Sequence, residues 1–212
     1  MKFEKFIYLY PPRPETSVQF GSKAFNGFKK PGWKAQYKLN GQRNLIFIEP
    51  DGNIQLWNRH REKHRNFKCP GWLIEEIQSQ MHVERGKWTV IDGELLHAKH
   101  ASVKNTMYLW DVLVLNGEYL INTTYADRYK MLSDVLDVNG QNDFANVISD
   151  HIWFARNIEP EMWDSAWEKT SVPIIEGFVL KNTLARLAPG FSSRNNSSWM
   201  VRCRLETKNY KF

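Results

Sequence analysis

Hydrophobic and polar positions alternate over short distances between residues 34 and 58, with turn signals between them. β-Branched and aromatic residues lie between Asn40-Gly41 and Asp51-Gly52, and both dipeptides accept the positive φ of tight turns. The pattern predicts strand, turn, strand, turn and strand. It places Lys38 next to a sharp backbone reversal, close to Arg43. Taken by itself, the stretch is most simply a plain hairpin that carries a solvated lysine.

Longer elements follow from the spacing of apolar residues in the rest of the chain. Helical spacing predicts helices over residues 70–83, 125–138 and 159–169. A nearly continuous apolar run predicts a buried central strand over residues 108–115. Further strands are expected over residues 6–10, 88–96 with a turn at Asp92-Gly93, 147–154, 174–181 and 199–205. No repeat or linker divides residues 1–212, so we expect one α+β domain with antiparallel strands and an irregular arm over residues 1–33.

The composition is that of a globular protein with a basic balance. The chain has 212 residues, a net charge of +6 and 14% aromatic residues, which favours polyanionic partners and flat ligands. Residues 59–68 form a strongly basic segment, either a solvated surface or a patch that contacts phosphates. Cys69 and Cys203 lack the spacing of a structural zinc site, and a reducing cytoplasm fits them. We expect neither a signal peptide nor a membrane helix, because no apolar run is long enough.

Charged residues interrupt several predicted strands, where such residues are rare unless they are paired or functional. They are Lys38, Glu94, Glu176, Lys181, Arg202 and Arg204. Arg202 and Arg204 alternate, so we expect them to point to the same side of their strand. A lysine held close to other cations, as Lys38 would be to Arg43 and Arg59, loses its proton more readily and becomes a nucleophile.

Five short motifs, in this order along the chain, resemble those of the covalent nucleotidyltransferase superfamily, which includes ATP-dependent DNA ligases, RNA ligases and mRNA capping enzymes. The matching segments are 38–43 (KLNGQR), 92–95 (DGEL), 108–117 (YLWDVLVLNG), 176–181 (EGFVLK) and 199–204 (WMVRCR). Residues 125–132 also resemble the arginine-bearing helix of DNA ligases. The resemblance implies an ATP-grasp-like nucleotidyltransferase (adenylation) domain of antiparallel sheets flanked by helices.

The resemblance also implies a reaction and a set of site residues. Lys38 would attack the α-phosphate of ATP, form lysyl-AMP and release pyrophosphate. AMP would then pass to a 5′-phosphate, and a 3′-hydroxyl would seal the strand. The other implied roles are Gln36 at the base edge, Trp110 stacked on the base, Glu94 at the ribose or metal, Arg43 and Arg59 at ribose or phosphate, Glu176 at Mg²⁺, and Lys181, Arg202 and Arg204 at the phosphates.

The expected function is an ATP-dependent polynucleotide ligase that acts on nicked or broken duplexes, with DNA slightly favoured over RNA. A GTP-using capping enzyme and a non-catalytic nucleic-acid-binding relative remain alternatives. Three features depart from a full DNA ligase: Asn40 replaces the usual aspartate, Arg202 and Arg204 replace lysines, and no OB-fold domain follows. Either the protein works without that domain, a partner protein replaces it, or the sequence is part of a longer chain. A monomer is expected.

Overall fold

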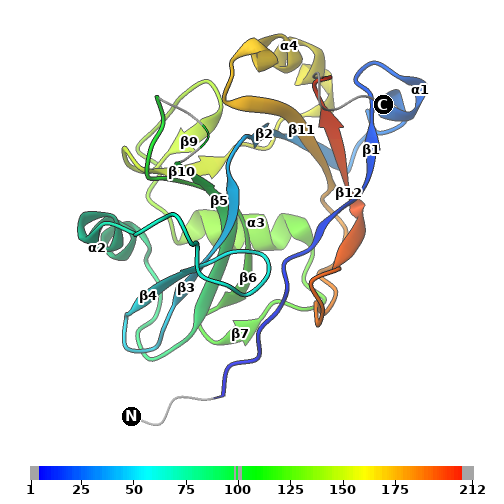
Figure 1. The fold of residues 1–212 in the computed structure, drawn as a ribbon. Coiled ribbons are helices and arrows are strands. Elements are labelled where there is room, and N and C mark those ends of the chain that lie inside the picture. The colour runs from blue at the N-terminus through cyan, green and yellow to red at the C-terminus, as the bar shows by residue number, and fades with distance from the viewer. Residues whose placement is uncertain (1–4, 98, 100–101, 207–212) are drawn as a thin grey trace.

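Two β-sheets form the framework of the protein (Figure 1). The computed structural model describes residues 5–97, 99 and 102–206. In the smaller sheet the strand order is β1 (Arg13–Val18), β12 (Asn196–Arg204), β11 (Ile175–Asn182) and β2 (Trp33–Leu39). In the larger sheet the order is β4 (Ile54–Trp57), β3 (Gln42–Ile48), β5 (Thr89–Leu96), β6 (Thr106–Leu115), β10 (Ile152–Ala155), β9 (Ala145–Val147) and β8 (Gly140–Gln141). A short strand, β7 (Glu118–Tyr119), pairs with β6.

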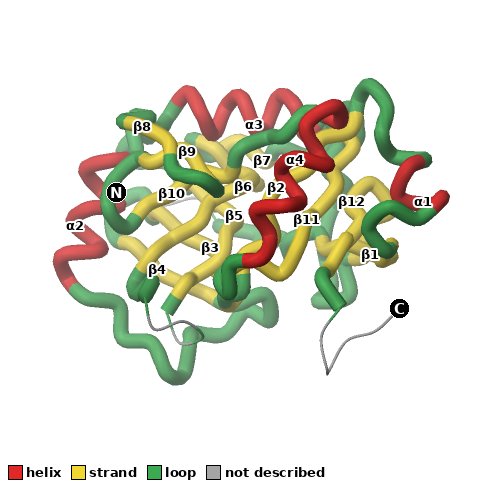
Figure 2. Tube along the Cα trace, turned by 90° about the horizontal axis from the view of Figure 1, so that it is seen from above, coloured by secondary structure: helices red, strands yellow, loops and turns green. Residues whose placement is uncertain are grey.

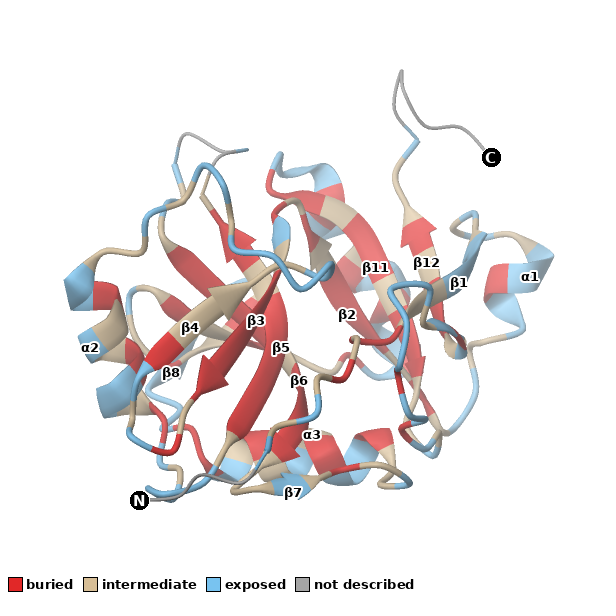
Figure 3. Ribbon diagram, turned by 60° about the horizontal axis from the view of Figure 1, so that its bottom comes forward, coloured by how far each residue is buried: buried red, intermediate tan, exposed pale blue. Residues whose placement is uncertain are grey.

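Helices cover the outer faces of these sheets (Figure 2). They are α1 (Lys23–Asn26), α2 (Gly71–Gln80), α3 (Tyr125–Asp134) and α4 (Trp163–Glu168), with 3₁₀ turns at Pro160–Met162 and Lys169–Ser171. The first hydrophobic core joins the larger sheet to α2 and α3, and the second joins the smaller sheet to α4. Figure 3 shows the buried residues concentrated on the strands of both sheets. Within the described residues, no helix is long and apolar enough to cross a membrane.

The predicted run of three strands over residues 34–58 exists, but its first turn does not form a hairpin. Strand β2 pairs with β11 in the smaller sheet, whereas β3 pairs with β4 and β5 in the larger one. Asn40-Gly41 therefore connects two sheets. Gly41 does not adopt the left-handed φ expected of a tight turn; instead, a Cβ there would lie 2.4 Å from Cγ of Glu94. The glycine is needed because the chain passes very close to β5.

The α+β class is confirmed, and several local expectations need correction. Two strand pairs, β1 with β12 and β10 with β6, are parallel, so the sheets are mixed and not purely antiparallel. Asp92-Gly93 is not a turn but lies within β5, where a Cβ on Gly93 would be 2.5 Å from the carbonyl oxygen of Tyr108. Residues 6–10 form no strand; the strand in the arm is β1, which pairs with distant β12.

The remaining differences concern where elements begin and end. The predicted strand over residues 147–154 is two strands, β9 and β10. The helices α2 and α3 end earlier than apolar spacing predicted, and the segment over residues 159–169 divides into a 3₁₀ turn and α4. The beginning of α3 follows ordinary capping chemistry, since the Thr124 hydroxyl accepts a hydrogen bond from the Asp127 amide at 3.2 Å.

A buried ion pair fastens α3 to the central strand β6. Arg128 is fully buried and donates to both carboxylate oxygens of Asp111, at 2.8 and 2.9 Å. It also donates to the carbonyl oxygen of Thr123 at 2.7 Å. Its guanidinium lies 5.7 Å from the ring centre of Tyr125 and 5.5 Å from that of Trp199. Bidentate pairing and contact with two rings give α3 one position relative to the sheet.

We expect Asp111→Asn to destabilise the fold by about 3–5 kcal/mol, because it leaves the buried Arg128 charge without a counter-charge. Urea unfolding should show a lower midpoint with an unchanged slope. The matched control is Asp134→Asn on the exposed side of α3, where the partner is Lys130 at 2.6 Å. That change should cost no more than about 0.5 kcal/mol. Equal effects of the two variants would contradict the assigned importance of the buried pair.

Candidate active site

A cavity of about 830 Å³ lies between the two sheets. Strand alternation determines which side chains enter it. Gln36 and Lys38 face the cavity from β2, and Val179 and Lys181 face it from β11. From β12 the lining residues include Met200, Arg202 and Arg204. The residues between them, such as Phe178, Leu180, Val201 and Cys203, are buried in the second hydrophobic core. The expectation that Arg202 and Arg204 point to the same side is confirmed.

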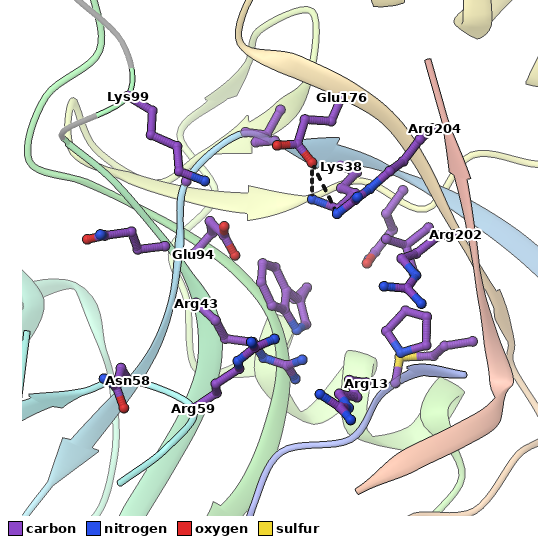
Figure 4. Close-up of a pocket in the computed structure, with 18 of the residues that line it drawn as sticks. Arg13, Lys38, Arg43, Asn58, Arg59, Glu94, Lys99, Glu176, Arg202 and Arg204 are labelled. Carbon is purple, nitrogen blue, oxygen red and sulfur yellow. Dashed lines mark hydrogen bonds and ion pairs between the residues drawn. The ribbon is translucent and has the colours of Figure 1, made fainter. Parts of the chain in front are cut away.

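The structure brings all the predicted site residues to this cavity. Its lining includes Gln36, Lys38, Arg43, Arg59, Glu94, Trp110, Glu176, Lys181, Arg202 and Arg204. They come from both sheets and from the loop after β4, so residues far apart in sequence share one space (Figure 4). Their individual chemical roles stay predictions.

Lys38 contacts a carboxylate on the wall of the cavity. Its Nζ is paired with Oε2 of Glu176, and Nη2 of Arg204 lies 3.7 Å from the same oxygen (Figure 4). Lys38 shares the cavity with Arg43 and Arg59 as expected, but the carboxylate of Glu176 in direct contact with its amine was not expected. Glu176 reaches this place at an irregularity in the pairing of β11 with β2. Gly177 there has φ +126, and a Cβ would lie 2.1 Å from the carbonyl oxygen of Cys203.

Arg43 is held by a carboxylate that the sequence had placed in a turn. Its Nε donates to Oδ1 of Asp92 at 2.8 Å, and its Nη2 contacts Oδ2. The indole nitrogen of Trp110 donates to the same carboxylate at 3.1 Å. The Arg43 guanidinium also lies 5.4 Å from the Trp110 ring centre. Asp92 thus fixes both the arginine and the indole, and Arg43 supports the ring that faces the cavity.

Lys181 is almost completely buried between two aromatic rings. It is 3% exposed, and its Nζ lies 4.5 Å from the Tyr125 ring centre and 5.8 Å from that of Trp110. Nζ also lies 3.3 Å from the Tyr125 hydroxyl oxygen. Burial lowers the pKa of Lys181 to about 7, which the nearby charges of Asp111 and Asp92 only partly oppose. Both protonation states are therefore accessible near neutral pH.

The fold is similar to that of solved DNA ligase structures. No family model matches the chain. A mycobacterial DNA ligase D solved in complex with ATP and MES superposes with a TM-score of 0.60 at 17% identity, over 91% of this chain and 59% of that one. A Lig E DNA ligase superposes with a TM-score of 0.55 at 15% identity, over 92% and 69% of the respective chains. The fold is that of a DNA ligase nucleotidyltransferase domain. The chain spans about three fifths of the ligase D structure.

The sequence comparison with curated proteins gives a different and shorter match. Tripartite motif-containing protein 5 of Saimiri boliviensis boliviensis is 28% identical over 115 residues, which is 51% of this chain and 22% of that protein. A match of this extent does not assign a family, so the superposition on DNA ligases carries the structural argument.

In this ligase fold, Glu94 is another carboxylate that lines the cavity. Burial raises the pKa of Glu94 to about 7, against the opposing charges of Lys38, Arg43 and Lys99. Among the described residues, no three His, Cys, Asp or Glu side chains gather closely enough to form a metal site. Glu94 and Glu176 nevertheless offer the hard oxygen ligands that Mg²⁺ prefers, and Mg²⁺ commonly completes its shell with water and phosphate oxygens. The donor set fits this ion.

The rim of the cavity contains basic residues that the sequence did not single out. Arg13 lies on β1, and its Nε donates to Oδ1 of Asn196 at 2.6 Å. Arg65, His60 and Lys99 also line the cavity. The basic composition of residues 59–68 was the signal for Arg65 and His60, whereas Arg13 was in an arm predicted to be irregular. Its placement depends on the pairing of β1 with β12, which no local pattern indicates.

We expect Glu94→Gln to change how stability depends on pH. The pKa of Glu94 is raised in the folded state. Its contribution to the free energy of unfolding is therefore fully present below pH 4.5 and is lost as the pH rises through about 7. The glutamine variant has no such loss, so it should gain about 3 kcal/mol in free energy of unfolding relative to the wild type between pH 4.5 and 8. Urea unfolding at several pH values measures this gain. The control is Glu118→Gln on exposed β7; a parallel pH dependence of the wild type and Glu94→Gln would contradict the prediction.

Proposed function

We propose that the chain is an ATP-dependent polynucleotide ligase that joins 3′-hydroxyl and 5′-phosphate ends through a lysyl-AMP intermediate on Lys38. The observation that carries this proposal is the position of Lys38 on the wall of a cavity that Trp110 also lines. The Lys38 amine pairs with Glu176, and Arg204 lies beside that carboxylate. The ligase fold supports it, and so does the ATP bound to the similar ligase D structure. The cavity volume of about 830 Å³ is sufficient for a nucleotide.

In the proposed first step, the nucleotide base stacks on Trp110 and presents its edge to Gln36. The Lys38 ammonium first gives a proton to the solvent, and its nitrogen then attacks the α-phosphorus. A nitrogen–phosphorus bond forms, the bond to pyrophosphate breaks, and the nitrogen loses one more proton to leave the phosphoramidate. Lys181, Arg202 and Arg204 line the same space and would neutralise the charge on the phosphate oxygens. Arg59 would contact ribose or phosphate from the rim. Glu176 and Glu94 would hold Mg²⁺, which neutralises phosphate charge when bound.

The proposed substrate is a polynucleotide because the basic residues extend beyond the cavity wall to its rim. Arg13, Arg59, Arg65 and Lys99 could follow a phosphate backbone, whose negative charges attract such clusters. DNA is slightly favoured because the similar solved structures are DNA ligases, and Lig E is described by DNA binding with a minimal scaffold. RNA remains the alternative substrate. A monomeric state belongs to the same proposal.

We expect Lys38→Ala to abolish the covalent adduct, because no other amine occupies the position of the Lys38 nitrogen. Intact-mass spectrometry after incubation with ATP and Mg²⁺ should show a gain of one AMP in the wild type and none in Lys38→Ala. The matched control is Lys34→Ala, since Lys34 is on the same strand but pairs with Glu159. Normal labelling of Lys38→Ala would contradict the assignment of Lys38 as the nucleophile. Salt-dependent nucleic-acid binding without any adduct would instead indicate the non-catalytic relative.

We expect Trp110→Ala to weaken ATP binding by about 1–3 kcal/mol, the usual contribution of a base stacked on an aromatic ring. Isothermal titration calorimetry of the Lys38→Ala background avoids turnover during the measurement. The control is Trp72→Ala, an exposed tryptophan on α2 that does not line the cavity. An unchanged affinity for ATP in Trp110→Ala would remove this residue from the nucleotide site.

A further inference from the structure

The hydroxyl of Tyr125 has a nearly complete set of hydrogen-bond partners. Tyr125 is fully buried at the beginning of α3, and burial raises the pKa of its phenol, so the phenol keeps its proton at neutral pH. That proton is donated to the carbonyl oxygen of Trp110 at 3.3 Å. Two donors approach the phenol oxygen, Nε2 of Gln36 at 2.8 Å and Nζ of Lys181 at 3.3 Å. One proton and two lone pairs are the full capacity of a phenol.

The side-chain amide of Gln36 is held in one orientation by two acceptors. Its Nε2 donates to Tyr125 and also to Oδ1 of Asn157 at 3.0 Å. Both amide hydrogens are therefore used within the protein, and Gln36 is only 2% exposed. The carbonyl Oε1 is the part of the amide that is left for a ligand in the cavity. Turning the amide over would require the Tyr125 proton to leave Trp110 and the Asn157 amide to turn as well.

We propose that Tyr125 and Asn157 are positioning residues that make Gln36 a hydrogen-bond acceptor and thereby select a 6-amino purine over a 6-oxo purine. This inference rests on the proposed function, since it assigns the residues through which the same site prefers ATP. The amino group of adenine can donate to Oε1 of Gln36. In the same stacked position guanine would place its own acceptor against that oxygen, and two buried acceptors that face each other lose their hydrogen bonds.

The Tyr125 hydroxyl also connects Gln36, the proposed residue at the base edge, with Trp110, the proposed residue at the base face. Trp110 is the proposed stacking residue, and the Tyr125 hydroxyl donates to the backbone carbonyl of that residue. Lys181, whose amine contacts both the phenol and its ring, extends the network toward the phosphates. A change at Tyr125 can therefore affect the rate with any nucleotide, and only the ratio between two nucleotides reports on the orientation of Gln36.

The test compares adduct formation with ATP and with GTP, each expressed as the second-order rate constant from initial rates. The wild type should prefer ATP by about a hundredfold or more, as sites that pair with a polar group do. Tyr125→Phe and Asn157→Leu should each reduce this ratio by about tenfold. Tyr129→Phe, which removes another hydroxyl of α3 that bonds to the Ala155 carbonyl outside the cavity, should leave the ratio unchanged.

A rescue variant separates positioning from a merely structural role. In Gln36→Glu both side-chain oxygens are acceptors, so the preference for ATP no longer depends on how the group is turned. Adding Tyr125→Phe to Gln36→Glu should then leave the ratio high, although the absolute rates fall. A ratio that stays unchanged in both Tyr125→Phe and Asn157→Leu, or falls equally with and without Gln36→Glu, would overturn the inference.

The proposed function and the inference can fail separately. If the wild type forms no adduct with either nucleotide, the proposed function fails, and the affinities for ATP and GTP then provide the same ratio by calorimetry. Equal affinities in the wild type would overturn the inference. Loss of the ATP preference in Tyr125→Phe, with the thermal unfolding midpoint preserved, would support it even in a protein that does not catalyse the reaction.

Discussion

The arrangement of the cavity depends on the ion pair between Asp111 and Arg128. Consecutive residues of β6 point to opposite faces, so Trp110 faces the cavity while Asp111 faces α3. The ion pair holds α3 against the sheet and places Tyr125, its first residue, beside the cavity wall. A buried pair of this kind is weak evidence for added stability, because removing two charges from water is costly. Its consequence here is positional, since it fixes the helix on which the Gln36 network depends.

A second constraint is the close approach of backbone segments at three glycines. Gly41 touches β5 at Glu94, Gly93 touches β6, and Gly177 touches β12. Each would place a Cβ within 2.5 Å of another atom. Because these glycines lie beside Lys38, Glu94 and Glu176, the contacts that bring the strands together also bring the charged side chains together. The motif glycines are thus explained by packing across strands and only in part by unusual φ angles.

Local patterns in the sequence were sufficient for most strands, and the resemblance of five short motifs pointed to residues that line the cavity. Alternation on β12 put Arg202 and Arg204 on one side, and the apolar run over residues 108–115 identified a central strand. The pairing of strands was not accessible in the same way. The pattern before and after Asn40-Gly41 is that of a hairpin, and only the choice of β11 as the partner of β2 divides it between sheets. Such a choice depends on residues more than a hundred positions away.

Residues that support others were harder to predict than residues that face a ligand. In the sequence, Asp92 looks like part of a turn. Tyr125 looks like an ordinary aromatic residue at the beginning of a helix. Their importance lies in the residues that they contact. Asp92 forms hydrogen bonds with Arg43 and Trp110, and Tyr125 forms one with Gln36. Hydrogen bonds of this kind join positions from different strands and leave no periodic signal. A motif identifies the side chain that performs the chemistry, but the side chain that orients it has to be found in three dimensions.

The charge of the cavity follows from the same arrangement. Among the described residues, its lining contains nine Lys or Arg and four Glu side chains, while the net charge of the whole chain is +6. Most of the excess positive charge is therefore gathered at one place, where repulsion between like charges opposes the folded state. The pairs of Lys38 with Glu176 and of Arg43 with Asp92, together with the low pKa of Lys181, reduce that repulsion before a ligand arrives. An anion in the cavity would reduce it further, so the structure favours polyanionic ligands even before any base or strand is recognised.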